Sequence, residues 1–103
     1  MGTIQYGLKE NVIQKIKKVF ASHPEVEEAI LYGSRAKGNF SRGSDIDFVL
    51  KGKELNQAIL NKIRWELDDL LLPYTIDIAI YDRIDHPELI EHINRLGVVF
   101  YRK

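Results

Sequence analysis

Helix-like and strand-like segments alternate along the 103 residues of this chain, and this alternation limits the folds open to it. Apolar residues recur at helical spacing in three segments, which predict helices over residues 9–22, 55–71 and 85–97. Short apolar segments predict strands over residues 28–32, 45–51, 75–81 and 98–101. A helical turn over residues 34–37, ended by Gly38, completes the order. The alternation predicts an α+β fold in which a small sheet is flanked by helices.

The connection between the first two predicted strands is short, and it constrains how they pair. Gly33 to Asp45 spans 13 residues, which is marginal for a parallel crossover, because such a crossover takes a dozen or more residues and usually a helix. We therefore expect an antiparallel or mixed sheet. Residues 1–8 are expected to be a loose lead-in, and the polar residues 39–44 a loop. The aromatic residues expected in the core are Tyr32, Phe48 and Trp65.

The size and net charge of the chain limit the class of protein to which it can belong. A chain of 103 residues is expected to form one domain, residues 1–103. Fifteen basic residues balance fifteen acidic ones, so the net charge predicts neither direct nucleic-acid binding nor membrane binding. The absence of cysteine excludes disulfides and thiolate metal sites. No apolar run approaches the roughly 20 residues of a membrane span, and no signal peptide begins the chain, so a cytoplasmic location is expected.

Three aspartates fall on two predicted strands. Asp45 and Asp47 are one residue apart, and Asp77 lies in the later strand. Side chains alternate between the faces of a strand, so all three carboxylates would share one face if the strands were neighbours in register. Three such carboxylates repel one another without a cation, and Mg²⁺ prefers oxygen ligands. The three residues are therefore candidate ligands for Mg²⁺, with room for two ions; the alternative is that they are solvated residues of a polar face.

A glycine–serine turn precedes the aspartates. Gly33 and Ser34 end one predicted strand and begin a helical turn, where a hydroxyl and backbone N–H groups can bind phosphate. The same pair is equally suited to capping a helix, but its combination with three strand aspartates favours phosphate. Ser44 is either a phosphate ligand or a turn residue. Basic residues near the acidic pair, which can bind phosphate or be ordinary surface cations, are Arg35, Lys37 and Arg42.

These motifs together resemble a known signature. Leu31-Tyr32-Gly33-Ser34, followed after ten residues by Asp45-Ile46-Asp47-Phe48, is similar to the signature of the polymerase-β-type nucleotidyltransferase superfamily, and Asp77 matches its third acid. The short chain and the Gly-Ser-Arg-Ala-Lys-Gly form resemble the minimal nucleotidyltransferases (MNT) of prokaryotes. The resemblance implies a small mixed sheet flanked by helices. It implies that Asp45 and Asp47 are metal ligands, Asp77 the third ligand and base, and Gly33 and Ser34 the phosphate-binding turn.

The resemblance also implies a function. Members of the MNT family often act with a separately encoded, helical HEPN-type protein, as antitoxins of a type VII-like toxin–antitoxin pair, and some of them transfer AMP from ATP to a tyrosine of that protein. The expected activity is therefore Mg²⁺-dependent nucleotidyl transfer to a hydroxyl of such a partner. One alternative is a binding module that neutralises its partner by contact alone. Another alternative is transfer to a small molecule or an RNA end. The lack of an acceptor domain and of net positive charge counts against this alternative.

Overall fold

The computed structural model describes residues 4–41 and 43–103, and from residue 10 onward it confirms the expected order of helices and strands. A short hairpin comes first, followed by four α-helices, one 3₁₀-helix and four further strands. Their bounds are β1 Ile4–Gln5, β2 Leu8–Lys9, α1 Glu10–Ala21, β3 Glu28–Tyr32, α2 Ser34–Lys37, β4 Ile46–Lys51, α3 Gln57–Asp68, β5 Ile76–Ile80, η1 Tyr81–Arg83, α4 Pro87–Leu96 and β6 Val98–Arg102.

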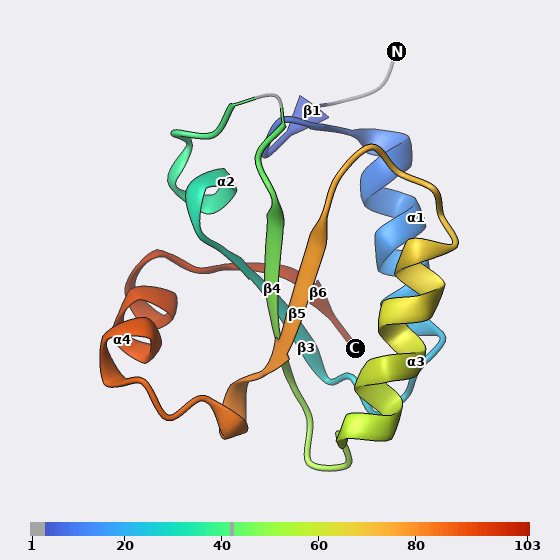
Figure 1. The fold of residues 1–103 in the computed structure, drawn as a ribbon, viewed down its shortest axis with the longest axis vertical. Helices are drawn as coiled ribbons and strands as arrows, with labels where there is room; N and C mark the ends of the chain where they lie inside the picture. The colour runs from blue at the N-terminus through green and yellow to red at the C-terminus, as the bar shows by residue number, and fades with distance from the viewer. Residues whose placement is uncertain (1–3, 42) are drawn as a thin grey trace.

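The main sheet is mixed, as the short connection between the first two strands suggests. Its strand order is β5-β4-β3-β6, with β4 in the middle beside β3 and β5 (Figure 1). β4 is antiparallel to β3 and parallel to β5, and β3 is antiparallel to β6. The parallel pair is possible because α3 lies between β4 and β5 in the chain and provides the crossover. The sheet is therefore the small mixed sheet of the expected α+β fold.

The larger core lies on one face of this sheet. In Figure 1, α1 and α3 lie together on one side of the sheet and α4 lies on the other. The residues of β4 that point toward α1 and α3 are fully buried: Ile46, Phe48 and Leu50. They meet Phe20 of α1, whose ring lies edge-on to that of Phe48 with centroids 5.2 Å apart. The strand residues between these apolar positions, including Asp47, consequently face the other way.

α4 covers only part of the opposite face. Ile93 of α4 packs with Ile30 of β3 and Val49 of β4 in a second, smaller cluster. Gly97 ends α4 so close to the sheet that an added Cβ atom would lie 2.7 Å from the Ile30 side chain. The next residues along the strands on this face, Tyr32 and Asp47, lie beside the covered area. This face therefore has an apolar half under α4 and a half with acidic residues.

Local signals explain where the helices begin and end. The side chain of His86 caps α4, accepting a hydrogen bond from the Leu89 N–H at 3.3 Å, and Pro87 occupies the first turn. Asn56 caps α3 in the same way, so α3 begins later than expected. It also ends earlier, because Leu71 has a φ of 54° and cannot continue a helix. No helix of the described residues is long and apolar enough to cross a membrane.

Two expectations from the sequence are wrong. Residues 4–9 are not a loose lead-in but a hairpin, in which Tyr6 and Gly7 both have positive φ, as a type I′ turn requires; residues 1–3 lie outside the described residues. Trp65 is not in the core, since 67% of it is exposed. The buried residues of α3 include Ile63 and Leu67, and Trp65 lies midway between them on the opposite side of the helix.

The turn after β4 gives a test of the packing. An added Cβ atom at Gly52 would lie 2.0 Å from the backbone oxygen of Glu25, which cannot move away as a flexible side chain would. We expect Gly52→Ala to lower the free energy of unfolding by about 1–3 kcal/mol in urea denaturation. Gly43→Ala is the matched control, because nothing lies within 4 Å of its added Cβ atom. Equal stability of the two variants would contradict the packing.

Candidate functional site

Three polar side chains form a row across neighbouring strands. Asp47 of β4 is paired in register with Asp77 of β5 on one side and with Tyr32 of β3 on the other. Neighbouring strands are about 4.7–4.9 Å apart, so side chains that share a face at one register position are close neighbours. The structure thus brings Asp47 and Asp77 onto one face, as the strand pattern predicts. Tyr32 joins them, although it was expected in the core.

Asp45 lies close to this row, and together Asp45, Asp47 and Asp77 form the acidic row. It comes one residue before β4 begins and is exposed, as is Asp77, whereas Asp47 between them is half-buried. Burial raises the pKa of Asp47 above its usual value, and the charges of Asp77 and Asp45 raise it further. Each carboxylate therefore makes the charged form of Asp47 less favourable, and a cation among them would relieve that repulsion.

The donor chemistry of the three aspartates fits a hard cation. All the donors are carboxylate oxygens, which Mg²⁺ prefers over nitrogen or sulfur. As the side chains stand, no group of three or more acidic or histidine residues among residues 4–41 and 43–103 is gathered closely enough to hold a metal ion. The candidate cation site is therefore supported by the face that Asp47 and Asp77 share and by the raised pKa of Asp47. Binding of a cation would draw the carboxylates together.

The turn before α2 lies against the Asp47 carboxylate. Gly33 has a φ of 79°, and an added Cβ atom there would lie 2.7 Å from Asp47 Oδ2. Only glycine satisfies both the backbone conformation and the close approach. Ser34 follows directly as the first residue of α2, and within the described residues its hydroxyl has no hydrogen-bond partner. The structure therefore places Gly33 and Ser34 beside the acidic row.

Arg35 is not a surface cation. Only 2% of it is exposed, and it is the one buried charged residue among those the structure describes. Its guanidinium donates to the backbone oxygen of Ser44 from Nε at 3.1 Å and from Nη2 at 2.8 Å, and to that of Tyr6 from Nη1 at 2.8 Å. The rings of Phe40 and Tyr74 lie on it, with centroids 5.3 and 4.9 Å from Cζ. These contacts stabilise the buried charge.

These contacts give Arg35 a positioning role. Its two hydrogen bonds to Ser44 hold the backbone directly before Asp45. The Ser44 hydroxyl accepts a hydrogen bond from the Ser41 N–H at 2.8 Å, which is typical of a turn residue. We therefore leave Arg35 and Ser44 out of the phosphate site. Lys37 is exposed, and Arg42 lies outside the described residues.

The sequence pattern alone did not identify Tyr32 as part of the site. It lies directly before Gly33, and it shares a face with Ile30, two residues earlier, which is in the cluster under α4. Its ring is edge-on to His92 of α4, with centroids 6.4 Å apart. Only the strand register could have shown that Tyr32 lies beside Asp47, because the sequence does not say which strands are neighbours.

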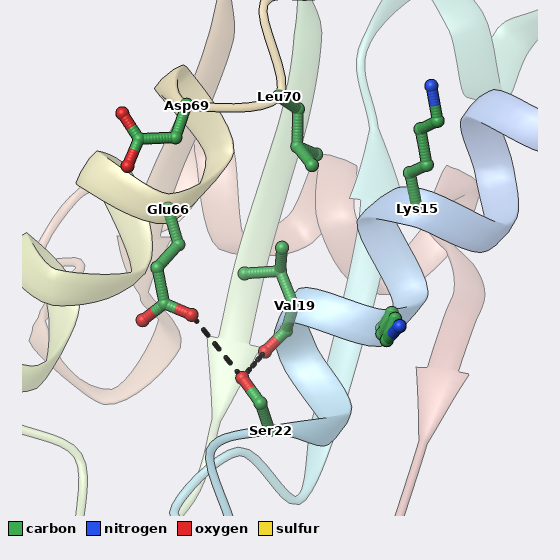
Figure 2. A pocket seen from close by; sticks show the side chains of 7 residues that line it. Lys15, Val19, Ser22, Glu66, Asp69 and Leu70 are labelled. Atoms are coloured by element: carbon green, nitrogen blue, oxygen red, sulfur yellow. Dashed lines mark hydrogen bonds between the residues drawn. The ribbon is translucent and has the colours of Figure 1, made fainter.

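A groove of about 570 Å³ lies between α1 and α3, on the face of the sheet opposite the aspartates. Figure 2 shows Lys15 and Val19 of α1 across the groove from Glu66 of α3. The Ser22 hydroxyl donates to the Val19 backbone oxygen at 2.7 Å and to Glu66 Oε1 at 3.4 Å. Glu66 Oε2 also lies 2.6 Å from His23 Nε2, within hydrogen-bond distance. Ser22 and Glu66 of this groove thus bind each other, and the three candidate aspartates lie on the other face of the sheet.

The role of Arg35 can be tested by stability. Arg35→Met keeps an alkyl chain between the rings but leaves the carbonyls of Ser44 and Tyr6 without their donor. We expect the free energy of unfolding to fall by about 2–4 kcal/mol in urea denaturation. Lys37→Met removes an exposed cation two residues further along α2 and should change it by less than about 0.5 kcal/mol. A phosphate ligand without a structural role would instead leave Arg35→Met as stable as its control.

The raised pKa of Asp47 predicts a pH-dependent gain in stability. Folding favours the protonated form of this carboxyl. Below the unfolded pKa of about 3.9 the group is protonated in both states, and the free energy of unfolding is not lowered. Above the folded pKa the group is charged in both states, and the free energy of unfolding is lowered by the full amount. Without metal, Asp47→Asn should therefore melt at a higher temperature than the wild type at pH 7. The gain should shrink as the pH falls toward about 4. Asp82→Asn, at an exposed position outside the row, should show no such trend; a pH-independent gain would contradict the repulsion.

Comparisons with known structures agree with this fold. A chain of the crystal structure of a toxin–antitoxin with AMP-PNP superposes with a TM-score of 0.72 and 20% identity, over 88% of this chain and 73% of that chain. A mutant of the toxin–antitoxin MntA-HpeT gives a TM-score of 0.70 and 17% identity, over 88% of this chain and 73% of that chain. The tri-AMPylated Shewanella oneidensis HEPN toxin in complex with MNT antitoxin gives a TM-score of 0.68 and 17% identity, over 91% of this chain and 72% of that chain. At these identities the likeness shows the fold alone.

The family is established by sequence. A comparison with curated proteins found no match. The family model described as polymerase beta, nucleotidyltransferase, however, matches residues 14–103, nearly the whole chain. The matched range contains the Gly33–Ser34 turn and all three aspartates. The resemblance seen in the sequence is therefore confirmed, and this chain belongs to the polymerase-β-type nucleotidyltransferase family.

Proposed function

We propose that this chain is a Mg²⁺-dependent nucleotidyltransferase that transfers AMP from ATP to a tyrosine hydroxyl of a separately encoded, HEPN-like helical protein. In this role it acts as the antitoxin of a type VII-like toxin–antitoxin pair. The observation that carries the proposal is the row of acidic side chains beside the Gly33–Ser34 turn, in a chain of the nucleotidyltransferase family. A family member that had lost this chemistry would have no need to keep repelling carboxylates in register.

Each residue of the site has a proposed task. Asp45 and Asp47 would hold Mg²⁺ with the triphosphate, and Asp77 would complete the site and take the proton of the acceptor hydroxyl. The N–H groups of the turn and the Ser34 hydroxyl would bind phosphate oxygens. Mg²⁺ held by these carboxylates, proposed as two ions, would supply charge neutralisation for the triphosphate and the departing pyrophosphate.

The transfer is a displacement at the α-phosphorus of ATP. The acceptor oxygen forms a bond to this phosphorus, the bond to the β-phosphate oxygen breaks, and pyrophosphate leaves. Asp77 is suited to accept the proton because it is exposed and paired in register with Asp47, so an incoming hydroxyl can reach it. Asp47, held against Gly33, is suited to the less mobile task of holding the metal and the nucleotide.

Two further observations support a protein acceptor. Two of the similar structures are a toxin–antitoxin with AMP-PNP and an AMPylated HEPN toxin in complex with MNT antitoxin, so adenine nucleotides and HEPN proteins occur with this fold. In this chain α4 covers the apolar half of the sheet face, while Asp45 and Asp77 beside it are exposed. The acidic row is thus open to a side chain from another molecule.

The proposal predicts a covalent product. We expect incubation with Mg²⁺, ATP and the HEPN-like partner to add about 329 Da per AMP to the partner, measured by intact-mass spectrometry. The adduct should be lost with Asp47→Asn in this chain and with replacement of the acceptor tyrosine by phenylalanine in the partner. Asp82→Asn, which is exposed and outside the row, should leave the adduct unchanged.

The same experiment separates the alternatives. A tight complex without any adduct, formed equally well by the Asp47→Asn variant, would show that this chain neutralises its partner by contact alone. Release of pyrophosphate from ATP with neither an adduct nor a complex would instead point to a small-molecule acceptor.

A further inference from the structure

We propose that Tyr32 is a positioning residue of the acidic site: its phenol hydroxyl donates a hydrogen bond to the Asp47–Asp77 carboxylates when a divalent cation binds, and so holds them in the ligating orientation. This inference rests on the proposed function only in requiring a metal at the aspartates. It concerns neither the nucleotide nor the acceptor.

The strand register places Tyr32 where this contact is possible. Tyr32 is the direct partner of Asp47 across the β3–β4 ladder, and Asp47 is the partner of Asp77 across the β4–β5 ladder. Side chains directly opposite in an antiparallel pair have Cβ atoms about 4.5–5.5 Å apart. Asp77 lies one strand further along the same face, at the same register position.

The electrostatics of Tyr32 agree with this register. Burial raises the pKa of Tyr32 above its usual value of 10, and the charges of Asp47 and then Asp77 raise it further. The hydroxyl is therefore always protonated in the physiological range. Ionised carboxylates accept hydrogen bonds and cannot donate them, so the phenol O–H is the matching donor. Within the described residues this hydroxyl has no hydrogen-bond partner, which leaves it available.

α4 holds the ring in place from the other side. The Tyr32 ring is half-buried, lies edge-on to His92 and packs against the cluster of Ile30, Val49 and Ile93. These contacts with α4 restrict rotation of the Tyr32 ring. Groups that orient metal-ligating carboxylates in this way typically change metal affinity by about 10–100-fold when they are removed.

The chain provides a matched control in Tyr81. This tyrosine begins η1, directly after β5, and packs against the same cluster under α4. Its hydroxyl donates to Asn94 Oδ1 of α4 at 2.9 Å rather than to the acidic row. Tyr32→Phe and Tyr81→Phe therefore remove the same atom from the surroundings of the same helix, and only Tyr32→Phe removes it beside the carboxylates.

The test is a titration of the full chain with Mn²⁺, without nucleotide or partner, followed by the loss of the free-ion signal in electron paramagnetic resonance. We expect Tyr32→Phe to weaken Mn²⁺ binding by about tenfold. We expect Tyr81→Phe to bind within about twofold of the wild type, and the bound-ion spectrum of Tyr32→Phe to differ from that of the wild type, because the ligands are less well oriented.

Each other outcome overturns a defined claim. Binding by Tyr32→Phe with wild-type affinity and an unchanged spectrum would show that the hydroxyl does not orient the ligands, while the metal site itself stands. An equal loss in Tyr32→Phe and Tyr81→Phe would attribute the effect to loosening of α4 and overturn the inference. Failure of the wild type to bind Mn²⁺ would overturn the metal site of the proposed function, and this inference with it.

Discussion

The register of β4 between its two neighbours is the constraint on which the site depends. Because β4 pairs in parallel with β5 and antiparallel with β3, one register position brings together Tyr32, Asp47 and Asp77. A shift by one residue would turn Asp47 into the core and expose Phe48, which is fully buried. The apolar face against α1 and α3 therefore fixes the register, and the acidic face follows from it.

Repulsion among the three aspartates lowers the stability of the fold, and the neighbouring residues accommodate these side chains. The raised pKa of Asp47 reflects both its burial and the charges of the other two aspartates. Gly33 allows the backbone to approach the Asp47 carboxylate, and Arg35 holds the backbone before Asp45 through the Ser44 carbonyl. A site under such repulsion is suited to a cation, since binding would convert the repulsion into attraction. The apolar half under α4 meanwhile supplies a rigid support.

The sequence predicted much of this arrangement because its signals are local. Helical periodicity, Pro87 and the glycines located the helices, and alternation along the strands put Asp45 and Asp47 on one side. The features that these local signals missed involve contacts between residues far apart in the chain. Arg35 is buried because Phe40, Tyr74 and two backbone carbonyls surround it, and the hairpin of residues 4–9 supplies one of those carbonyls. Trp65 is exposed because the rest of α3 already fills the core.

The sequence by itself determined the order of the elements, the α+β class, the family and the identity of the three acidic residues. These features depend on the spacing of residues near one another in the chain. Only the tertiary structure decided which strands are neighbours, that Tyr32 lies beside Asp47, and that Arg35 is buried and donates to the backbone of Ser44 and Tyr6. Such facts depend on contacts between residues far apart in sequence, and those contacts are set when the buried faces pack, not by any local pattern.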